Sequence, residues 1–259
     1  MIGRDSLVSV IIPVYNGERY LAEAIESALS QDHRPMQVIV VNDGSTDDTE
    51  AVARSYGNDI TYLQQENRGP AAARNRGLQI SQGVLIAFLD VDDLWSRNKI
   101  PLQLARLAEA PSVEIVLGLS QPMKLQWGEG GRPRFEKWHD PFCALLLSAG
   151  LFRKSVLEKV GVFDETLRYG EDTDWFMRAR EMGISIDLQQ EVTLFYRRHG
   201  SNMTLDSTLR NSYFIKTLKK SLDRRRQQGD RQVEPFPKLN NLEKIMTHRK
   251  NSSGYGETP

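Results

Sequence analysis

Three aspartates, Asp90, Asp92 and Asp93, stand close together directly after an apolar stretch at residues 84–89. If that stretch is a buried strand, the carboxylates gather at its end, where their mutual repulsion is costly without a cation. Mg²⁺ and Mn²⁺ prefer oxygen ligands and often combine one or two carboxylates with substrate phosphates and water. The cluster therefore predicts a divalent metal that holds a diphosphate. The alternative is that the aspartates cap the next helix and face water.

Two more polar sets follow strand-like segments. Tyr15, Asn16 and Glu18 come after residues 8–12, and Asp43 comes after residues 38–41. In an open parallel sheet, ligands bind outside the carboxyl ends of the strands, so we expect all three polar sets at one edge. There the Asp43 carboxylate could accept a hydrogen bond from a nucleobase N–H group. Alternatively, its segment NDGSTDDT is only an Asx turn that leads into a helix cap.

The elements that must position these residues alternate along the first half of the chain. The β-branched, continuously apolar runs predict strands that are buried on both faces, as in parallel sheets. The alternation predicts an α/β fold with a mostly parallel, Rossmann-like sheet flanked by helices. The expected strands are 8–12, 38–41, 60–63 and 84–89, and the expected helices are 19–30, 46–56 and 70–80.

The second half is less regular. We expect helices at 97–110, 155–160, 172–182 and 212–227, strands at 113–119, 184–188 and 192–197, and a mobile glycine-rich loop at 128–131. This pattern predicts one domain at 1–210, made of a half at 1–110 and a smaller mixed region at 111–210. A basic C-terminal helix at 211–228 follows, and the polar, proline-containing residues 229–259 are expected to be disordered.

Composition limits the partners and the compartment. Lysine and arginine total 34, as do aspartate and glutamate, so overall charge gives no reason to expect a nucleic acid partner. The single cysteine, Cys143, cannot form an intrachain disulfide, and no cysteine–histidine cluster has zinc-ligand spacing, which favours a reducing, cytoplasmic setting. The apolar run near the N-terminus is too short to span a membrane and lacks the layout of a secretory signal.

The expected last helix is strongly basic at residues 216–226, with apolar residues interspersed. Such a helix can dock peripherally on anionic lipid, here at the inner face of the membrane, or it can be a solvated helix that packs on the domain. The basic residues are Lys216, Lys219, Lys220, Arg224, Arg225 and Arg226, and the apolar ones are Ile215, Leu218 and Leu222.

Several segments, taken in order from residue 8 to residue 199, resemble the inverting family 2 glycosyltransferases with the nucleotide-sugar-binding GT-A fold. They are VSVIIPVYNGERYLAEAIES, VIVVNDGSTDDT and FLDVDD. The resemblance implies that Asp43 lies at the base, that Asp90 lies near the ribose or metal, and that Asp92 ligates the metal directly. The residues implied to bind the nucleotide are Pro13, Tyr15, Asn16, Glu18, Asp43, Asn67, Arg74 and Asp90.

Three later segments extend the resemblance. Arg74, in the run Ala-Arg-Asn that follows Asn67 and Gly69, is implied to lie near the nucleotide, although it could simply face solvent. The segment GEDTDW resembles the family's ED motif, which implies Asp172 as the catalytic base; a helix-capping role is the alternative. The segment YRRH implies that His199 reaches the metal or diphosphate, unless it is a surface histidine. Glu171, Trp175 and Asp93 are expected on the acceptor or donor-sugar side.

The implied reaction is a Mn²⁺- or Mg²⁺-dependent, inverting transfer of a sugar from a nucleoside diphosphate sugar, by default a UDP-sugar. The acceptor would be a hydroxyl of a polysaccharide, glycolipid, lipid-linked saccharide or other glycoconjugate. The stretch 124–148, with Trp127, Phe135, Trp138 and His139, is suited either to a sugar platform or lid or to a satellite core.

Three rival functions stay open. A nucleotidyltransferase should carry a basic, glycine-rich loop after the first strand, where this chain has VYNGERY. A haloacid-dehalogenase-like phosphatase places its D-x-D-G-T pattern at the first strand, whereas LDVDDLW comes late and lacks Gly-Thr. A non-catalytic nucleotide-sugar-binding or scaffolding subunit would not need Asp172 beside Glu171.

Overall fold

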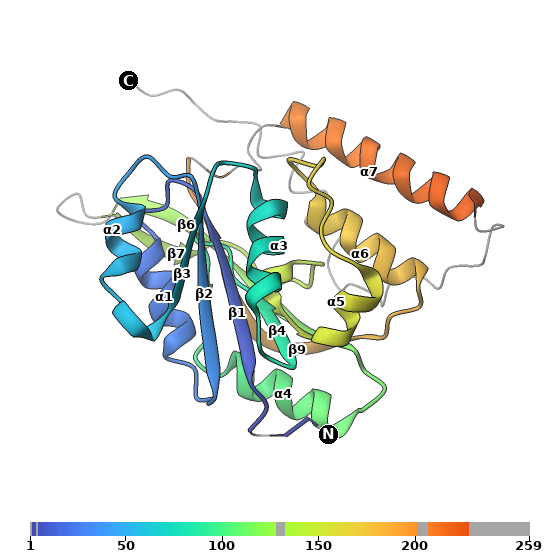
Figure 1. Ribbon diagram of the computed structural model, residues 1–259, viewed down its shortest axis with the longest axis horizontal. Helices are drawn as coiled ribbons and strands as arrows, with labels where there is room; N and C mark the ends of the chain where they lie inside the picture. The colour runs from blue at the N-terminus through green and yellow to red at the C-terminus, as the bar shows by residue number, and fades with distance from the viewer. Residues whose placement is uncertain (1, 4, 128–132, 201, 203–206, 228–259) are drawn as a thin grey trace.

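The computed structural model describes residues 2–3, 5–127, 133–200, 202 and 207–227 (Figure 1). The predicted loop at 128–131 and the predicted disordered tail at 229–259 lie outside these residues. Within the described part of the chain, no helix combines the length and the apolar character that a bilayer crossing requires.

A single mixed sheet runs through the molecule in the order β3-β2-β1-β4-β8-β6-β9-β5, with β7 paired to β6. The first four strands in this order are parallel, as the sequence predicts, and the remainder is mixed. The strands are β1 (Val8–Val14), β2 (Met36–Asp43), β3 (Thr61–Gln65), β4 (Leu85–Phe88), β5 (Leu94–Trp95), β6 (Ile115–Trp127), β7 (Pro133–Lys137), β8 (Gly150–Arg153) and β9 (Ile186–Arg198).

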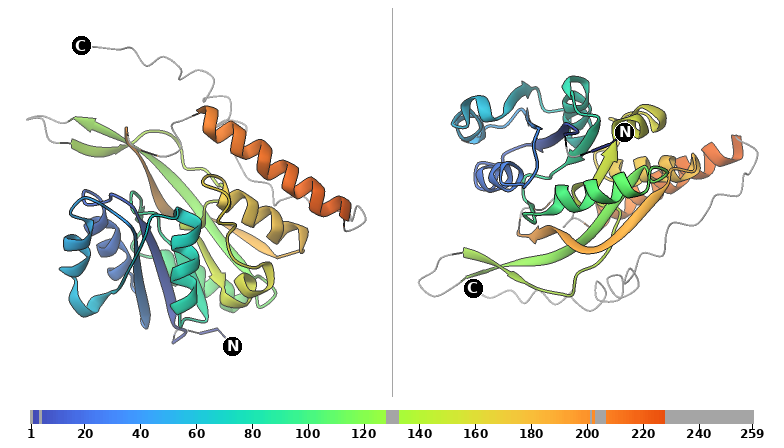
Figure 2. Two further views of the ribbon diagram at one scale, coloured as in Figure 1. Left: turned by 45° about the horizontal axis from the view of Figure 1, so that its top comes forward. Right: turned by 90° about the horizontal axis from the view of Figure 1, so that it is seen from below.

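Helices cover both faces of the sheet, so each strand of the parallel half is buried on two sides. Along β1, Val10 and Ile12 pack into one apolar cluster and Ile11 packs into the other, and all three are fully buried. One face carries α1 (Leu21–Leu29), α2 (Thr49–Arg54) and α4 (Lys99–Glu109); the other carries α3 (Pro70–Ile80), α5 (Lys154–Val160) and α6 (Glu171–Glu181), as Figure 2 shows. Short 3-10 turns lie at Gly57–Asp59 and Leu147–Ala149.

Two strands are longer than the apolar pattern indicates. The segments predicted as separate strands at 184–188 and 192–197 form one continuous strand, β9, and the strand predicted at 113–119 extends to Trp127. The pairing of β6 with β9 shifts register between Leu117 and Ser120. This irregularity lets the ladder continue past Gln190 and Glu191, whose exposed polar side chains interrupt the apolar pattern.

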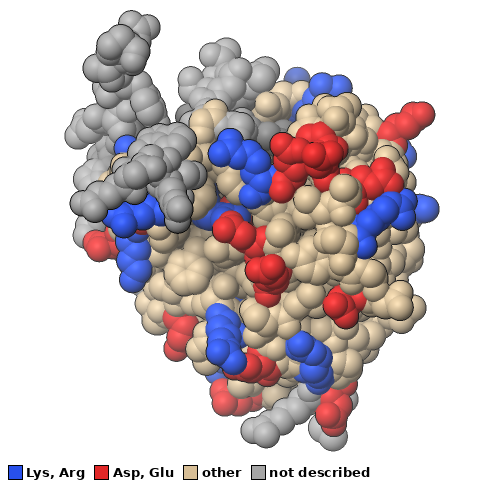
Figure 3. All heavy atoms as spheres, turned by 90° about the vertical axis from the view of Figure 1, so that its left-hand side faces the viewer, with Lys and Arg blue, Asp and Glu red and all other residues tan. Residues whose placement is uncertain are grey.

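The face that carries α1 and α2 has acidic and basic side chains interspersed (Figure 3). This mixture agrees with the balanced composition of the chain.

The last described helix, α7 (Ser207–Gln227), packs along α6 and is fastened there by charged contacts. Arg224 Nη1 lies 2.9 Å from Asp174 Oδ1, and Arg224 Nε lies 2.8 Å from Glu181 Oε2. Lys220 forms an ion pair with Asp164, in the segment between α5 and α6. Burial alone would raise the pKa of Asp164, but the hydrogen bonds from Lys220 and Thr166 lower it to about 2.

A substitution Lys220→Met tests this attachment. The folded-state pKa of Asp164 is below its unfolded value, so the ion pair stabilises the fold above about pH 4, and this stabilisation disappears as the pH falls toward 2. We expect the variant to lose about 1 kcal/mol of unfolding free energy at pH 7 and to converge with the wild type near pH 2, measured by urea unfolding. A difference that persists unchanged at low pH would contradict the ion-pair explanation.

Candidate functional site

The loops that follow β1 and β2 are joined by hydrogen bonds at the carboxyl edge of the sheet. Asn16 Oδ1 accepts a hydrogen bond from the Thr46 backbone N–H at 2.8 Å, and the Asn16 N–H donates to Ser45 Oγ at 2.9 Å. Glu18 Oε2 accepts from the Asp48 N–H at 2.9 Å. The two polar side chains therefore hold the loops together, while Tyr15 between the strand and Asn16 is 51% exposed. Pro13 is buried within β1 itself.

Asp43, the last residue of β2, organises the loop before α3. Its Oδ1 accepts hydrogen bonds from Gln65 Nε2 at 2.7 Å and from the Arg68 N–H at 2.9 Å, and its Oδ2 accepts from the Gly69 N–H at 2.7 Å. Gly44 follows with φ +76°, and a Cβ atom there would approach the Asn67 nitrogen to 2.8 Å. The close approach of the two loops thus requires glycine. A hydrogen bond from a nucleobase to Asp43 stays a prediction.

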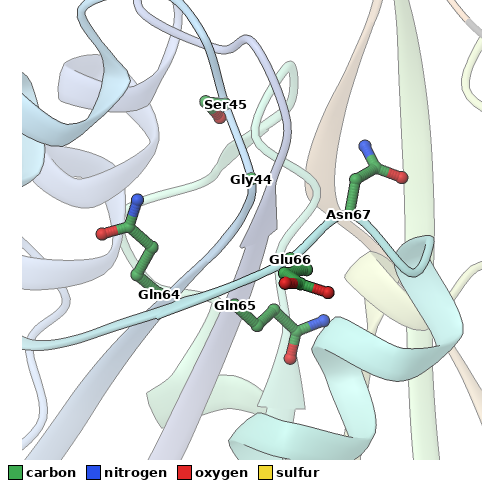
Figure 4. Close-up of a pocket in the computed structure, with 6 residues that line it drawn as sticks. All are labelled: Gly44, Ser45, Gln64, Gln65, Glu66 and Asn67. Atoms are coloured by element: carbon green, nitrogen blue, oxygen red, sulfur yellow. The ribbon is translucent and has the colours of Figure 1, made fainter.

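An open hollow of about 630 Å³ lies beside these loops (Figure 4). It is lined by Gly44 and Ser45, after β2, and by residues 64–67, at the end of β3. Gln65, which also bonds Asp43, is among them. The lining is therefore polar and is built from two of the strand ends where the sequence places nucleotide contacts, including Asn67.

Arg74, on α3, joins the two halves of the domain through two carboxylates. Its Nη2 lies 2.6 Å from Asp90 Oδ1, just beyond β4, and its Nη1 forms an ion pair with Glu171, the first residue of α6. The arginine is only 6% exposed, so the alternative of a solvent-facing arginine does not hold. Burial alone would lower the pKa of Arg74, but Asp90 and Glu171 raise it and the guanidinium stays charged.

Asp172 stands next to this ion pair in the first turn of α6. Gly170, with φ +73°, is the N-cap of the helix, and Asp172 Oδ1 accepts a hydrogen bond from the Thr173 N–H at 2.6 Å. Burial raises the pKa of Asp172, and Arg74 and the Thr173 hydrogen bonds oppose this while Asp90 adds to it, so the net shift is upward. A carboxylate with a raised pKa is a better proton acceptor near neutral pH than an ordinary aspartate.

Asp92 and His199 meet although 106 residues separate them in the sequence. His199 Nε2 lies 3.3 Å from Asp92 Oδ2, and Asn202 Nδ2 donates to the same oxygen at 2.8 Å. The His199 ring stacks on Tyr20 with centroids 4.6 Å apart, which fixes its position. The alternative of a surface histidine fails, because the His199 side chain is only 6% exposed.

Asp92 and His199 could supply two ligands to a cation whose other ligands come from a substrate and water. Within the described ranges, no group of three or more histidine, cysteine, aspartate or glutamate side chains is placed to hold a metal. Mg²⁺ and Mn²⁺ sites need not be complete protein cages, since phosphate oxygens and water commonly fill several positions. One carboxylate and one imidazole therefore fit such an ion when a diphosphate supplies further oxygens, and Asp90 lies two residues away.

The glycosyl transferase family 2 model matches residues 9–146, more than half of the chain. The chain belongs to glycosyl transferase family 2.

Relatives and solved structures agree with this assignment. An uncharacterized glycosyltransferase of Rickettsia prowazekii (strain Madrid E) is 36% identical over 216 residues, which are 76% of this chain and 66% of the relative. The minor teichoic acid biosynthesis protein GgaA of Bacillus subtilis (strain 168) is 30% identical over 228 residues, 81% of this chain and 50% of that protein. The chain thus spans two thirds or less of the length of these relatives.

Two solved structures share the fold. TarS 1-349 of S. aureus in complex with UDP-GlcNAc has a TM-score of 0.66 and 23% identity, over 83% of this chain and 65% of that one. The mannosyltransferase PcManGT of Pyrobaculum calidifontis, in complex with GDP-Man and Mn²⁺, has a TM-score of 0.66 and 20% identity, over 89% of this chain and 66% of that one. The predicted α/β fold of the GT-A type is therefore confirmed.

The family 2 motifs do not include the residues that support the backbone of Asp90 through hydrogen bonds. The Asp90 N–H donates to Ser148 Oγ at 3.0 Å. The carbonyl groups of residues 148, 149 and 150 accept hydrogen bonds at 2.8 Å from Trp95 Nε1, Gln103 Nε2 and Lys99 Nζ, respectively. Lys99 and Gln103 are fully buried in α4. Their polar side chains four residues apart, on the apolar face of a helix, are the sequence signal that could have revealed this support.

Two residues expected at the sugar side lie in the interior instead. Trp175 is fully buried, donates from Nε1 to the Gly161 carbonyl at 2.8 Å, and packs against aromatic rings of the core. Asp93 is 1% exposed and accepts a hydrogen bond from the Arg197 N–H at 2.9 Å. Burial, Asp92 and Asp90 raise the pKa of Asp93 against the opposing effect of Arg197.

Arg197 lies in the YRRH segment, but the resemblance assigned a role there only to His199. It is 2% exposed, donates from Nε to the Asp92 carbonyl, and forms an ion pair with Glu23 on α1. These contacts fix the backbone between the aspartates of the DVDD segment.

The aromatic residues expected to form a platform divide between two groups. Phe135 packs edge to face with Tyr20, at 6.4 Å between ring centroids, on the side of His199. Trp138 lies beside His139 and under the Arg198 guanidinium. The Trp127 side chain lies outside the described part, so the platform stays a prediction.

Arg74→Met tests whether the buried bridge holds the two halves together. Removal of the cation leaves Glu171 buried without its partner, so we expect a loss of about 3–5 kcal/mol in unfolding free energy. Arg68→Met is the matched control, because its ion pair with Glu165 is exposed, with side chains 63% and 38% accessible, and should contribute about 0–1 kcal/mol. Urea denaturation measures both variants. Equal losses would show that the Arg74 bridge contributes no more than a surface pair.

Proposed function

We propose that this chain transfers a sugar from a nucleoside diphosphate sugar to an acceptor hydroxyl, with inversion at the anomeric carbon. The proposal rests on the Arg74 bridge, which joins Asp90 to Glu171 and so brings Asp90 near Asp172. The relatives and the solved structures support it. One relative is named as a teichoic acid biosynthesis protein, one solved structure is a complex with UDP-GlcNAc, and the other is a complex with GDP-Man and Mn²⁺. A UDP-sugar is the default donor.

The nucleotide is assigned to the loops at the carboxyl ends of β1 to β4. The hollow next to Asp43 is assigned to the nucleobase. Asp90, whose side chain is 40% exposed, is assigned to contact the ribose or the metal. Tyr15 is exposed where it can contact the nucleoside. Asn16 and Glu18 act mainly by holding the two loops in register, since both already bond the backbone of the opposite loop.

Asp92 and His199 are assigned to a divalent cation, Mn²⁺ or Mg²⁺, together with the donor diphosphate. When bound, this ion supplies Lewis acidity that stabilises the negative charge on the leaving diphosphate. The protein's own contribution is to hold the two ligands at a fixed separation. Asn202 and Tyr20 do this by binding the Asp92 carboxylate and stacking on the His199 ring.

Asp172 is assigned as the general base. Its carboxylate accepts the proton of the acceptor hydroxyl while that oxygen attacks the anomeric carbon from the face opposite the leaving diphosphate. Arg74 and Glu171 act as positioning residues, because Arg74 pairs with both Glu171 at the start of α6 and Asp90 just beyond β4. The acceptor is assigned to a polysaccharide, glycolipid or other glycoconjugate hydroxyl.

The division of roles is testable with two variants. We expect Asp172→Asn to lower kcat by roughly 10²–10⁴-fold while the Kd for the nucleotide stays within about twofold, because the base acts only on the acceptor proton. Asp92→Ala should instead weaken nucleotide binding in the presence of Mn²⁺. Calorimetry with UDP, with and without Mn²⁺, and a transfer assay measure these effects. Asp59→Asn, an exposed substitution elsewhere, serves as the control.

The proposed roles and two of the rival functions have separate outcomes in these assays. Equal losses of nucleotide binding in both variants would refute the proposed roles. Pyrophosphate release from a nucleoside triphosphate would indicate a nucleotidyltransferase. Tight nucleotide-sugar binding with neither transfer nor hydrolysis would indicate a non-catalytic subunit.

The pH dependence of transfer follows from the raised pKa of Asp172. A general base is active only when deprotonated, so activity falls as the pH drops through the pKa of the base. Because burial raises that pKa, the acid limb should lie at higher pH than an ordinary aspartate, with a pKa near 3.8, would give. The profile of kcat/KM measures the limb. A flat profile down to pH 4 would exclude Asp172 as the base.

A further inference from the structure

Helix α7 packs on the domain through its polar face, whereas an ordinary surface helix packs through its apolar face. Its buried face is polar, with Thr217 fully buried and Ser221 8% exposed against the domain. Its outward face carries large apolar side chains that are 38–66% exposed: Phe214, Ile215, Leu218 and Leu222. A contiguous exposed apolar surface usually marks an interaction site, whereas single exposed apolar residues are ordinary.

The basic residues of α7 separate into two groups by the same geometry. Lys220 and Arg224 face the domain, where Asp164, Asp174 and Glu181 neutralise them. Lys216, Lys219 and Arg226 are exposed, and none forms an ion pair with a carboxylate of the described residues. Two of the six basic residues noted in the sequence, Lys220 and Arg224, therefore fasten the helix, and the outward ones remain available to an anionic partner.

The outward apolar and basic residues form adjoining strips. With 3.6 residues per turn, the four apolar side chains fall within a strip roughly 100° wide, and Lys219, Arg226 and Lys216 fall beside it on the solvent side. An apolar strip flanked by lysine and arginine is the arrangement of helices that lie in the plane of a membrane interface. In Figures 1 and 2, α7 runs along the outside of α6 at the periphery of the molecule.

We propose that α7 docks this protein on a membrane surface that carries anionic phospholipid. The apolar strip enters the headgroup boundary, and Lys216, Lys219 and Arg226 contact the lipid phosphates. Two other occupants fit the charge less well. A second copy of the helix would bring like charges together, and residues 228–259 contain five lysines and arginines against four acidic residues, so they offer no negative surplus. The docking does not depend on the proposed function.

Sedimentation of the full chain with vesicles tests the proposal. We expect binding to vesicles of phosphatidylcholine with phosphatidylglycerol, weak binding to phosphatidylcholine alone, and release at high salt because salt screens the attraction to the headgroups. The triple variant Lys216→Gln, Lys219→Gln, Arg226→Gln should reduce the partition coefficient at least about tenfold. The double variant Ile215→Asn, Leu222→Asn should also lose binding.

Matched controls distinguish the loss of docking from a general loss of positive charge and from a loss of folding. Arg76→Gln, Lys137→Gln, Lys159→Gln removes three exposed charges away from α7 and should leave vesicle binding unchanged. All substituted side chains are exposed, so melting temperatures should be close to that of the wild type, and calorimetry with UDP measures nucleotide binding independently. Vesicle binding that is unchanged in the α7 variants, or absent in the wild type, overturns the proposal. A dimer in sedimentation velocity that the double variant abolishes, without vesicle binding, would assign the strip to a second copy instead.

Discussion

The geometry of the candidate site depends on a buried arginine, Arg74, that bridges two carboxylates. Arg74 takes one partner from the end of β4 and the other from the start of α6, 97 residues further along the chain than itself. A guanidinium can bind two carboxylates in fixed directions, which a lysine ammonium cannot do as specifically. Asn75, the next residue of α3, adds a reciprocal pair of hydrogen bonds, both 2.9 Å long, with the backbone of Phe163. Helix α3 thus aligns the region around Phe163 and Glu171 with the end of β4.

The aspartates after β4 depend on support from several directions because they repel one another. Ser148 holds the backbone of Asp90, Arg197 holds the backbone of Asp92 and the carboxylate of Asp93, and Asn202 binds the carboxylate of Asp92. Asp90 and Asp92 keep partly exposed side chains, 40% and 26% accessible, whereas Asp93 is buried. A rigid arrangement of this kind positions charged groups before a ligand arrives, which lowers the cost of binding and of charge development.

The sequence predicted those features whose cause is local or periodic. The parallel strands follow from continuous β-branched runs, and the convergence of Asn16 with the loop after β2 follows from strand direction alone. The functions of Trp175 and Asp93 could not be predicted this way, because burial depends on which segments pack over them. The partners of Ser148, Lys99 and Gln103 are likewise set by tertiary contacts. For α7, the pattern showed a basic amphipathic helix, but only the packing shows that its polar side faces inward.

We propose that Asp92 and His199 hold a cation against the diphosphate of a sugar nucleotide, beside the carboxylates that Arg74 bridges. A crystal structure of the full chain with Mn²⁺ and a UDP-sugar, with the manganese located by anomalous scattering, tests it most directly. We expect an anomalous peak bonded to Asp92, His199 and diphosphate oxygens, with Arg74 still bridging Asp90 and Glu171. A nucleotide bound elsewhere, or a peak away from Asp92 with its carboxylate turned to bulk solvent, would contradict it.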